Sequence, residues 1–145
     1  MKPLPILGSL LLTTSPVFAD DFSYLQCDLE GVMQRKEIKS NQILESQNVG
    51  GNIRLKIDFE NTRVMDAIVG KWQDVVISNG VITNSTQETI DGVNRQFKIS
   101  VEADPPGVLS IDQLDRSDRF SITVKVKGTC KNVDQTVFEK TLKEL

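Results

Sequence analysis

Apolar and polar residues alternate along much of this chain, which is the pattern of half-buried β-strands. The clearest example is segment 119–130, in which every second residue lies on one largely apolar face and the residues between are polar or charged. Segments 52–60 and 93–102 repeat this alternation. We therefore expect an all-β protein whose strands turn one apolar face toward a common core.

Arg95 interrupts the alternation, because it falls on the apolar side of segment 93–102. A strand end or a local bulge would let such a side chain reach solvent, and this is the favoured interpretation. The alternative is that the arginine points inward. There it would pair with an Asp or Glu side chain or meet an anionic ligand.

Short turn signals separate the alternating segments. Asn79-Gly80 and Asp91-Gly92 readily supply the positive φ angles that tight hairpins need. Gly50-Gly51-Asn52 predicts a further turn, directly before the next alternating segment.

Two more segments end strands. Segment 104–107 contains two prolines, which lack the amide hydrogen needed in a β-ladder, and segment 115–118 is a polar connection. The chain then divides into roughly eight to ten short strands with brief links. This spacing predicts a single antiparallel meander closed into a small barrel, with a two-sheet β-sandwich as the alternative.

Two segments fit more than one structure. Residues 65–72 match both strand and helix spacing, and we favour a strand. At the C-terminus, Phe138, Leu142 and Leu145 are spaced as on a short amphipathic helix that begins near Asp134. A helix and a strand fit this last segment equally well.

Both cysteines fall on apolar strand faces. Cys27 shares a face with Leu25 and Leu29, and Cys130 lies on the apolar side of segment 119–130. In a chain exported to an oxidising space, two cysteines most simply form one disulfide, and this pair lacks the C-x-x-C spacing of redox centres. Disulfide geometry requires α-carbons within about 7 Å. The first and last strands must therefore meet, as they do in a barrel or a sandwich.

Residues 1–19 have the layout of a cleavable secretory signal peptide. A positive start precedes the apolar run 4–12, and Val17-Phe18-Ala19 places small residues at the −3 and −1 positions. The apolar run is much shorter than the roughly 20 residues that span a bilayer, and no later stretch approaches that length. We expect a single mature domain, residues 20–145, without a transmembrane segment, in the periplasm or the secreted space.

Composition excludes several chemistries. The chain has no histidine, which removes Ser-His-Asp and Cys-His catalysis and most catalytic zinc sites. It has no phosphate-cradling glycine loop, and its net charge of −3 argues against nucleic-acid binding. We expect no cofactor and no enzymatic activity. Carboxylate chemistry of the glycosidase type, which needs two acids about 5–10 Å apart, remains as an alternative.

A few residues are candidates for binding. Trp72 and Lys71 lie in the least regular region and, with Arg95, are candidates for a binding surface, although a lone tryptophan is more often a packing residue. Asp112, Asp115 and Asp118 offer oxygen ligands for Ca²⁺, but their spacing does not match a known calcium loop and a solvated hairpin is favoured. Asn84 begins an Asn-Ser-Thr glycosylation pattern, which matters only in a eukaryotic source.

The ends of the chain resemble a group of small exported bacterial β-proteins of unknown function. Tyr24-Leu25-Gln26-Cys27, then Gly31, and the late Gly128-Thr129-Cys130 carry this resemblance. It implies an envelope or secreted location and a disulfide-tied β-domain, with no activity. Periplasmic C-type lysozyme inhibitors are similar in size, export and barrel shape. Their Ser-Gly-rich inhibitory loop is not found in this sequence, so their role is not carried over.

These observations favour a non-enzymatic binding or interaction module of the bacterial periplasm or secreted space. Its partner would be another envelope protein, recognised through a loop or an exposed strand edge. The alternative is a lipocalin-like carrier that holds a small apolar ligand inside the barrel. A carboxylate-based hydrolase is the third hypothesis.

Overall fold

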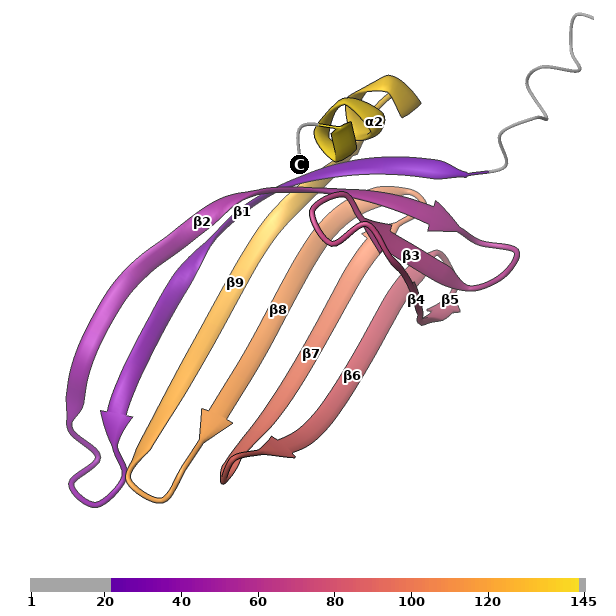
Figure 1. Cartoon of the computed structure of the whole chain (residues 1–145). Coiled ribbons are helices and arrows are strands. Elements are labelled where there is room, and N and C mark those ends of the chain that lie inside the picture. Colours follow the sequence, from indigo (N-terminus) through magenta and orange to yellow (C-terminus); the bar gives the residue numbers. More distant parts are fainter. Residues whose placement is uncertain (1–21, 144–145) are drawn as a thin grey trace, which may run out of the picture.

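The structure is a computed structural model that describes residues 22–143 of the chain. The expected signal peptide lies outside the described residues. The described chain forms nine strands and one C-terminal helix (Figure 1), which confirms the all-β prediction. In chain order these are β1 (Ser23–Glu37), β2 (Ile43–Asp58), β3 (Arg63–Asp66), β4 (Trp72–Asp74), β5 (Val76–Ser78), β6 (Val81–Ile90), β7 (Val93–Ala103), β8 (Pro106–Arg116), β9 (Phe120–Asn132) and α2 (Gln135–Lys143).

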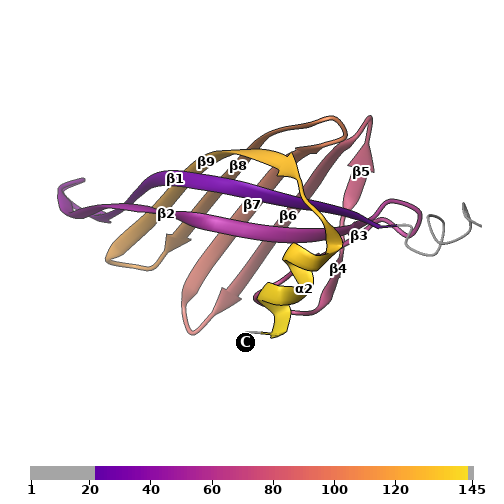
Figure 2. The same ribbon diagram turned by 90° about the horizontal axis from the view of Figure 1, so that it is seen from above.

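The strands form one antiparallel sheet that follows the chain around a ring. Their order in the sheet is β4-β3-β2-β1-β9-β8-β7-β6-β5, so β1 pairs with both β2 and β9. The outermost strands, β4 and β5, are consecutive in the chain and are separated only by Val75. The sheet is therefore a nearly closed barrel (Figures 1 and 2), which confirms the predicted barrel over the sandwich.

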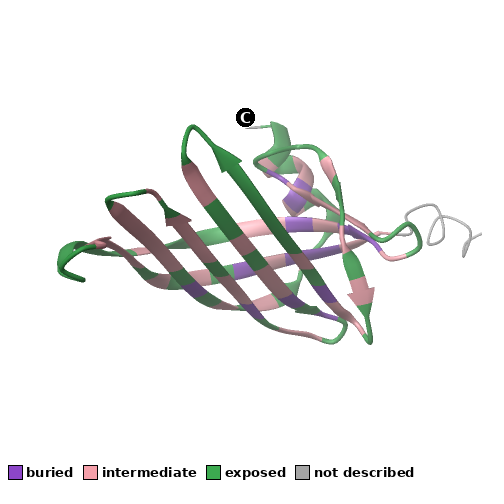
Figure 3. Ribbon diagram, turned by 90° about the horizontal axis from the view of Figure 1, so that it is seen from below, coloured by how far each residue is buried: buried purple, intermediate pink, exposed green. Residues whose placement is uncertain are grey.

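The hydrophobic core fills one half of this barrel, which we call the closed half. There β1 and β2 cross over β6, β7 and β8 (Figure 2) and their inward side chains meet. The buried residues of this cluster are Leu25, Cys27, Leu55, Ile57, Ile82, Val101, Ala103 and Leu109. Toward the far ends of the same strands, side chains are mostly exposed or half-buried (Figure 3).

Cys27 and Cys130 form the predicted disulfide between β1 and β9. The two residues are register partners, and their α-carbons are 4.0 Å apart. Cys27 is fully buried in the core of the closed half. The disulfide therefore joins the first long strand to the last one from the inner face of the sheet, as predicted.

The predicted turn at Gly50-Gly51-Asn52 is wrong, because these residues lie inside β2 and pair with β1. Gly51 has a φ of 143°, a conformation that disfavours other residues. A neighbouring glycine, Gly31 of β1, lies so close to β9 that a Cβ would overlap the carbonyl oxygen of Lys125. The glycines here let long strands bend and approach each other instead of ending a strand.

The other turn predictions are mostly confirmed. Asn79-Gly80 joins β5 to β6 and Asp91-Gly92 joins β6 to β7, and all four residues have positive φ angles. The prolines of segment 104–107 follow the end of β7, although the second of them already begins β8. β8 extends through Arg116, because residues 115 and 116 still pair with both neighbouring strands. The polar connection therefore starts at residue 117.

The two ambiguous segments are now assigned. Residues 65–72 form neither the favoured strand nor a helix: β3 ends at Asp66, residues 67–71 turn, and β4 begins at Trp72. The C-terminal segment forms α2, whose Phe138 is buried with Tyr24 and Ala67 in a second small cluster. No helix among residues 22–143 is long and apolar enough to cross a membrane.

A buried carboxylate organises the turn between β2 and β3. Asp58 is only 2% exposed. It accepts hydrogen bonds from the backbone N–H of Asn61 at 3.1 Å, from the Asn61 side-chain amide at 2.9 Å and from Nε of Arg63 at 2.8 Å. The Asn61 side-chain hydrogen bond, together with Arg63, lowers the pKa of Asp58 from its ordinary value.

Candidate functional site

The end of the barrel opposite the core is not closed, and we call it the open half. β3 pairs with β2 only at residues 55–58, and β5 pairs with β6 only at residues 81–83. Within residues 22–143, segment 43–53 of β2 and segment 84–90 of β6 therefore have a strand on one side only. The open half is the region between these two free edges, visible at the lower end of the sheet in Figure 1.

The free edge of β6 lacks the usual protection against pairing. Natural edge strands are commonly blunted by charges, prolines or bulges. Segment 84–90 reads Asn-Ser-Thr-Gln-Glu-Thr-Ile, so it has one charge, no proline and no glycine. Its ladder with β7 is regular throughout. Segment 43–53 also has a single charge, Glu45, but it contains the two glycines and the bend described above.

The hairpin geometry shows which backbone groups of β6 are available. A two-residue turn closes the β6–β7 hairpin, so the flanking residues Ile90 and Val93 exchange both backbone hydrogen bonds. Every second residue of β6 counted back from Ile90 then bonds to β7. The intervening residues direct their N–H and C=O groups to the open side; these are Ser85, Gln87 and Thr89. The β5–β6 hairpin has the same type of turn, and it likewise assigns the odd-numbered residues of β6 to the side away from β7.

A row of charged side chains crosses the inner face of the open half. Glu88, Arg95 and Asp115 are successive register partners on β6, β7 and β8. On the other side of β9, Arg35 of β1 is the register partner of Glu45 of β2. Ile122 of β9 links the two groups in register. The row ends in a glutamate at each free edge. We use the name charged row for these five charged residues together with Ile122: Glu88, Arg95, Asp115, Ile122, Arg35 and Glu45.

Arg95 is explained by a direct ion pair. Its Nε donates to Oδ1 of Asp115 at 2.9 Å and its Nη2 donates to Oδ2 at 3.1 Å. The hydrogen bond and charge of Asp115 raise the pKa of Arg95, and Glu88 adds a smaller contribution in the same direction. The β7–β8 register is regular at Arg95, so there is no bulge at this position. Arg95 is the third residue of β7 and its side chain is about half exposed, as expected near a strand end, and it also makes the ion pair of the alternative interpretation.

All members of the charged row except Glu45 line a pocket of about 480 Å³ at the mouth of the barrel. Apolar side chains, including Ile90, Val93 and Phe120, complete its wall. The Arg35 guanidinium lies 5.3 Å from the centroid of the Phe120 ring. Its Nε is 3.8 Å from Glu45 and has no hydrogen-bond partner. The pocket is therefore amphipathic, with both charges and apolar surface.

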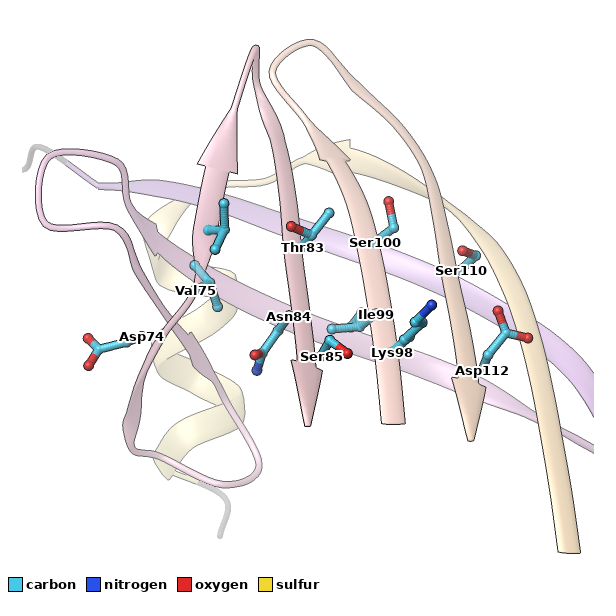
Figure 4. A pocket seen from close by; sticks show the side chains of 11 residues that line it. Asp74, Val75, Thr83, Asn84, Ser85, Lys98, Ile99, Ser100, Ser110 and Asp112 are labelled. Atoms are coloured by element: carbon cyan, nitrogen blue, oxygen red, sulfur yellow. The ribbon is translucent and has the colours of Figure 1, made fainter. Parts of the chain in front are cut away.

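A second depression of about 640 Å³ lies beside β5 (Figure 4). Hydroxyl side chains of β6, β7 and β8 contribute most of its polar groups, together with Lys98 and Asp112. Asn84, the first residue of the glycosylation pattern, also lines it and is half-buried. This surface offers hydrogen-bonding groups next to the free edge of β6.

The structure does not bring the predicted binding residues together. Trp72 belongs to β4, where its ring packs against Phe22 with centroids 5.6 Å apart and against the Arg63 guanidinium at 4.2 Å. Lys71 is exposed in the turn before β4. Arg95 instead lies in the mouth pocket of the open half.

The three predicted calcium ligands are also separated. Asp115 is on the inner face and is bound by Arg95. Asp112 is three residues earlier in the same strand and so faces outward, while Asp118 lies in the connection to β9. Among the residues that the structure describes, no group of three or more His, Cys, Asp or Glu side chains could hold a metal ion.

Comparison with known proteins gives no relative. No protein-family model matches the chain, and neither a curated protein nor a solved structure matches it.

Sequence reasoning missed the free edge of β6 and the glutamates of the charged row. One signal was present in the hairpin lengths. The segment between Asp74 and Asn79 is too short to cover the whole strand that lies between the Asn79-Gly80 and Asp91-Gly92 turns. A short strand paired with a long one must leave part of the long strand unpaired.

Proposed function

We propose that this protein is a non-enzymatic binding module of the bacterial periplasm or secreted space, and that it binds a protein partner by strand addition in the open half. The observation that carries this proposal is the regular, nearly uncharged free edge of β6. An extended segment placed there would bond to the backbone of Ser85, Gln87 and Thr89. In strand addition these main-chain bonds supply affinity, and the alternating side chains supply specificity.

The disulfide supports the compartment. Disulfides persist in oxidising spaces such as the bacterial periplasm and the exterior of the cell. The Cys27–Cys130 bond is consistent with such a location. The signal-peptide pattern of residues 1–19 points to the same compartment.

The test is affinity capture from an envelope extract with an edge-blocked variant. Gln87→Pro removes one N–H that faces the open side, without removing a donor from the β6–β7 ladder. Gln87→Ala keeps the N–H and is the matched control. We expect a protein partner that is retained by the wild type and by Gln87→Ala and lost with Gln87→Pro, while circular dichroism shows all three folded. A partner retained equally by Gln87→Pro would contradict strand addition at β6.

The lipocalin-like carrier remains the second candidate, because the mouth pocket has the size of a small-molecule site, about 480 Å³. Its lining includes Arg35, Glu88, Arg95 and Asp115. Such a wall suits an amphiphilic ligand better than the purely apolar one expected from the sequence. Native mass spectrometry of the exported protein tests this. A small molecule that co-purifies with the wild type and is absent from the Arg95→Gln variant would favour the carrier.

The carboxylate-based hydrolase stays third. Asp115 is the least exposed carboxylate of the mouth, and Arg95 binds both of its oxygens. Both oxygens of this carboxylate are therefore already engaged by the arginine.

A further inference from the structure

We propose that the segment added to β6 is an extended stretch of a partner protein that places a lysine or arginine beside Glu88, with an apolar residue two positions away beside Ile90. This inference rests on the proposed function and specifies the chemistry of the partner. It follows from the charged row and from the side chains that flank Glu88 on the same face.

The charge at the free edge of β6 selects a basic residue. On the inner face, Arg95 pairs with Asp115 in the interior of the sheet, and at the β2 edge Arg35 lies 3.8 Å from Glu45. Arg95 is committed to Asp115 through two hydrogen bonds. Within the described chain, no lysine or arginine nitrogen lies within 4.0 Å of the Glu88 carboxylate. An incoming strand would occupy the next position in this row, where a cation extends the alternation of charge.

The neighbours of Glu88 select the flanking residue. Because side chains alternate between the faces of a strand, Thr86 and Ile90 flank Glu88 on the inner face. Ile90 is 57% exposed at the free edge, and its register partner in β7 is the apolar Val93. An apolar side chain on the added strand would cover Ile90. The recognised pattern therefore has a basic and an apolar residue two positions apart.

The same charges disfavour a second copy of this chain as the occupant. The free edge of β6 carries Glu88 as its one charge, and the free edge of β2 carries Glu45. Pairing β6 with either edge of another copy would bring a carboxylate toward a carboxylate or leave Glu88 without a cation. The preferred occupant is a different, basic segment.

Two synthetic peptides test the inference. Both are ten residues long, with valine at inward positions and threonine at outward positions, and they differ at one central inward residue, lysine or glutamate. Fluorescence anisotropy with the full mature protein measures the two dissociation constants. Cross-strand charge pairs of this kind contribute modest energies, so we expect the lysine peptide to bind roughly five- to tenfold more tightly.

Two variants make the test specific. Glu88→Lys should reverse the preference toward the glutamate peptide. Glu139→Lys changes the net charge by the same amount on the distant helix α2 and should leave the preference unchanged. Equal reversal by both variants would show a general charge effect and would overturn the role of Glu88.

Hydrogen exchange separates this inference from the proposed function. If the bound lysine peptide protects the amides of Gln87 and Thr89 and the glutamate peptide protects them less, both proposals stand. If both peptides bind and protect these amides equally, strand addition stands and the charge selection fails. If neither peptide protects them at any concentration, strand addition at β6 fails as well.

Discussion

At the residue scale, two charged side chains are tied to specific partners. The buried Asp58 accepts a hydrogen bond from Arg63, and the more exposed Arg95 donates two hydrogen bonds to Asp115. A buried carboxylate such as Asp58 costs free energy if a partner is removed, because its charge is left without compensation. The hydrogen-bond donors of Asp58 therefore matter for stability.

Asp58 makes the stability of the protein depend on pH. Its pKa is lower in the folded protein than its ordinary value of about 3.9 in an unfolded chain. The stabilisation is therefore present above pH 4 and is lost as the pH falls through the lower, folded-state pKa. We expect Asp58→Asn to reduce the free energy of unfolding at pH 7, and the difference from wild type to shrink as the pH falls below about 4.

Urea unfolding at a series of pH values measures this effect. Asp66→Asn is a suitable control, because Asp66 is another carboxylate of the same region whose hydrogen bond, to the backbone of Ile68, is exposed. A difference between wild type and Asp58→Asn that stays constant from pH 7 to pH 3 would contradict the assigned role of the ionised carboxylate.

At the scale of the elements, the two sets of backbone amides in β6 should differ in their rates of hydrogen exchange. Along 84–90, one set of amides bonds to β7 and the other set faces the open side. We expect the amides of Gln87 and Thr89 to exchange faster than those of Thr86 and Glu88 by an order of magnitude or more. Residue-resolved hydrogen exchange of the free protein measures this, and uniform protection of all four amides would mean that the edge is covered.

Gly31 of β1 leads to a second prediction at this scale, about the spacing of β1 and β9. A methyl group at Gly31 would overlap the carbonyl oxygen of Lys125 in the neighbouring strand. Gly31→Ala must push β1 and β9 apart, so we expect a loss of about 1–3 kcal/mol in the free energy of unfolding. Val32→Ala, at an exposed position of the same strand, should cost much less. Equal losses measured by urea titration would show that the close approach of the strands is unimportant.

The sequence predicted the elements better than their lengths. Alternation identifies strands because one face of the sheet is buried, and Asn79-Gly80 and Asp91-Gly92 identify hairpins because few other pairs adopt their φ angles. Gly50-Gly51 failed as a turn signal because glycine serves equally at a bend within a strand. Helix α2 could not be chosen over a strand, since Phe138 is buried by Tyr24 and Ala67, which are distant in sequence.

The candidate site was less predictable for a related reason. Arg95 was recognised as unusual, but its partner Asp115 lies on another strand and depends on the register. Trp72 and Lys71 attracted notice through residue type and belong to the closed half. The free edge arises because β5 is much shorter than β6, which is a property of two elements and not of any residue.

At the scale of the whole molecule, β1 and β9 join two groups of strands into one barrel. β2, β3 and β4 extend the sheet from β1, and β5 to β8 extend it from β9. The β1–β9 ladder runs from Leu25 to Glu37 and so passes through both the closed and the open half. The only covalent link between these two strands apart from the main chain is the Cys27–Cys130 disulfide, which spans 103 residues. The integrity of the ring therefore depends on this pairing.

Removal of the disulfide should destabilise the ring as a unit. A link across so long a loop restricts the unfolded chain strongly, and we expect the Cys27→Ala/Cys130→Ala variant to lose about 2–4 kcal/mol of unfolding free energy in urea. Wild-type protein treated with a reductant should show a similar loss, which separates the link itself from packing changes at the alanines. Because the ladder crosses both halves, exchange of β6 and β7 amides should accelerate along with that of β1 and β9. Faster amide exchange in the closed half alone would show that the open half folds and pairs independently. The barrel would then not position the free edges.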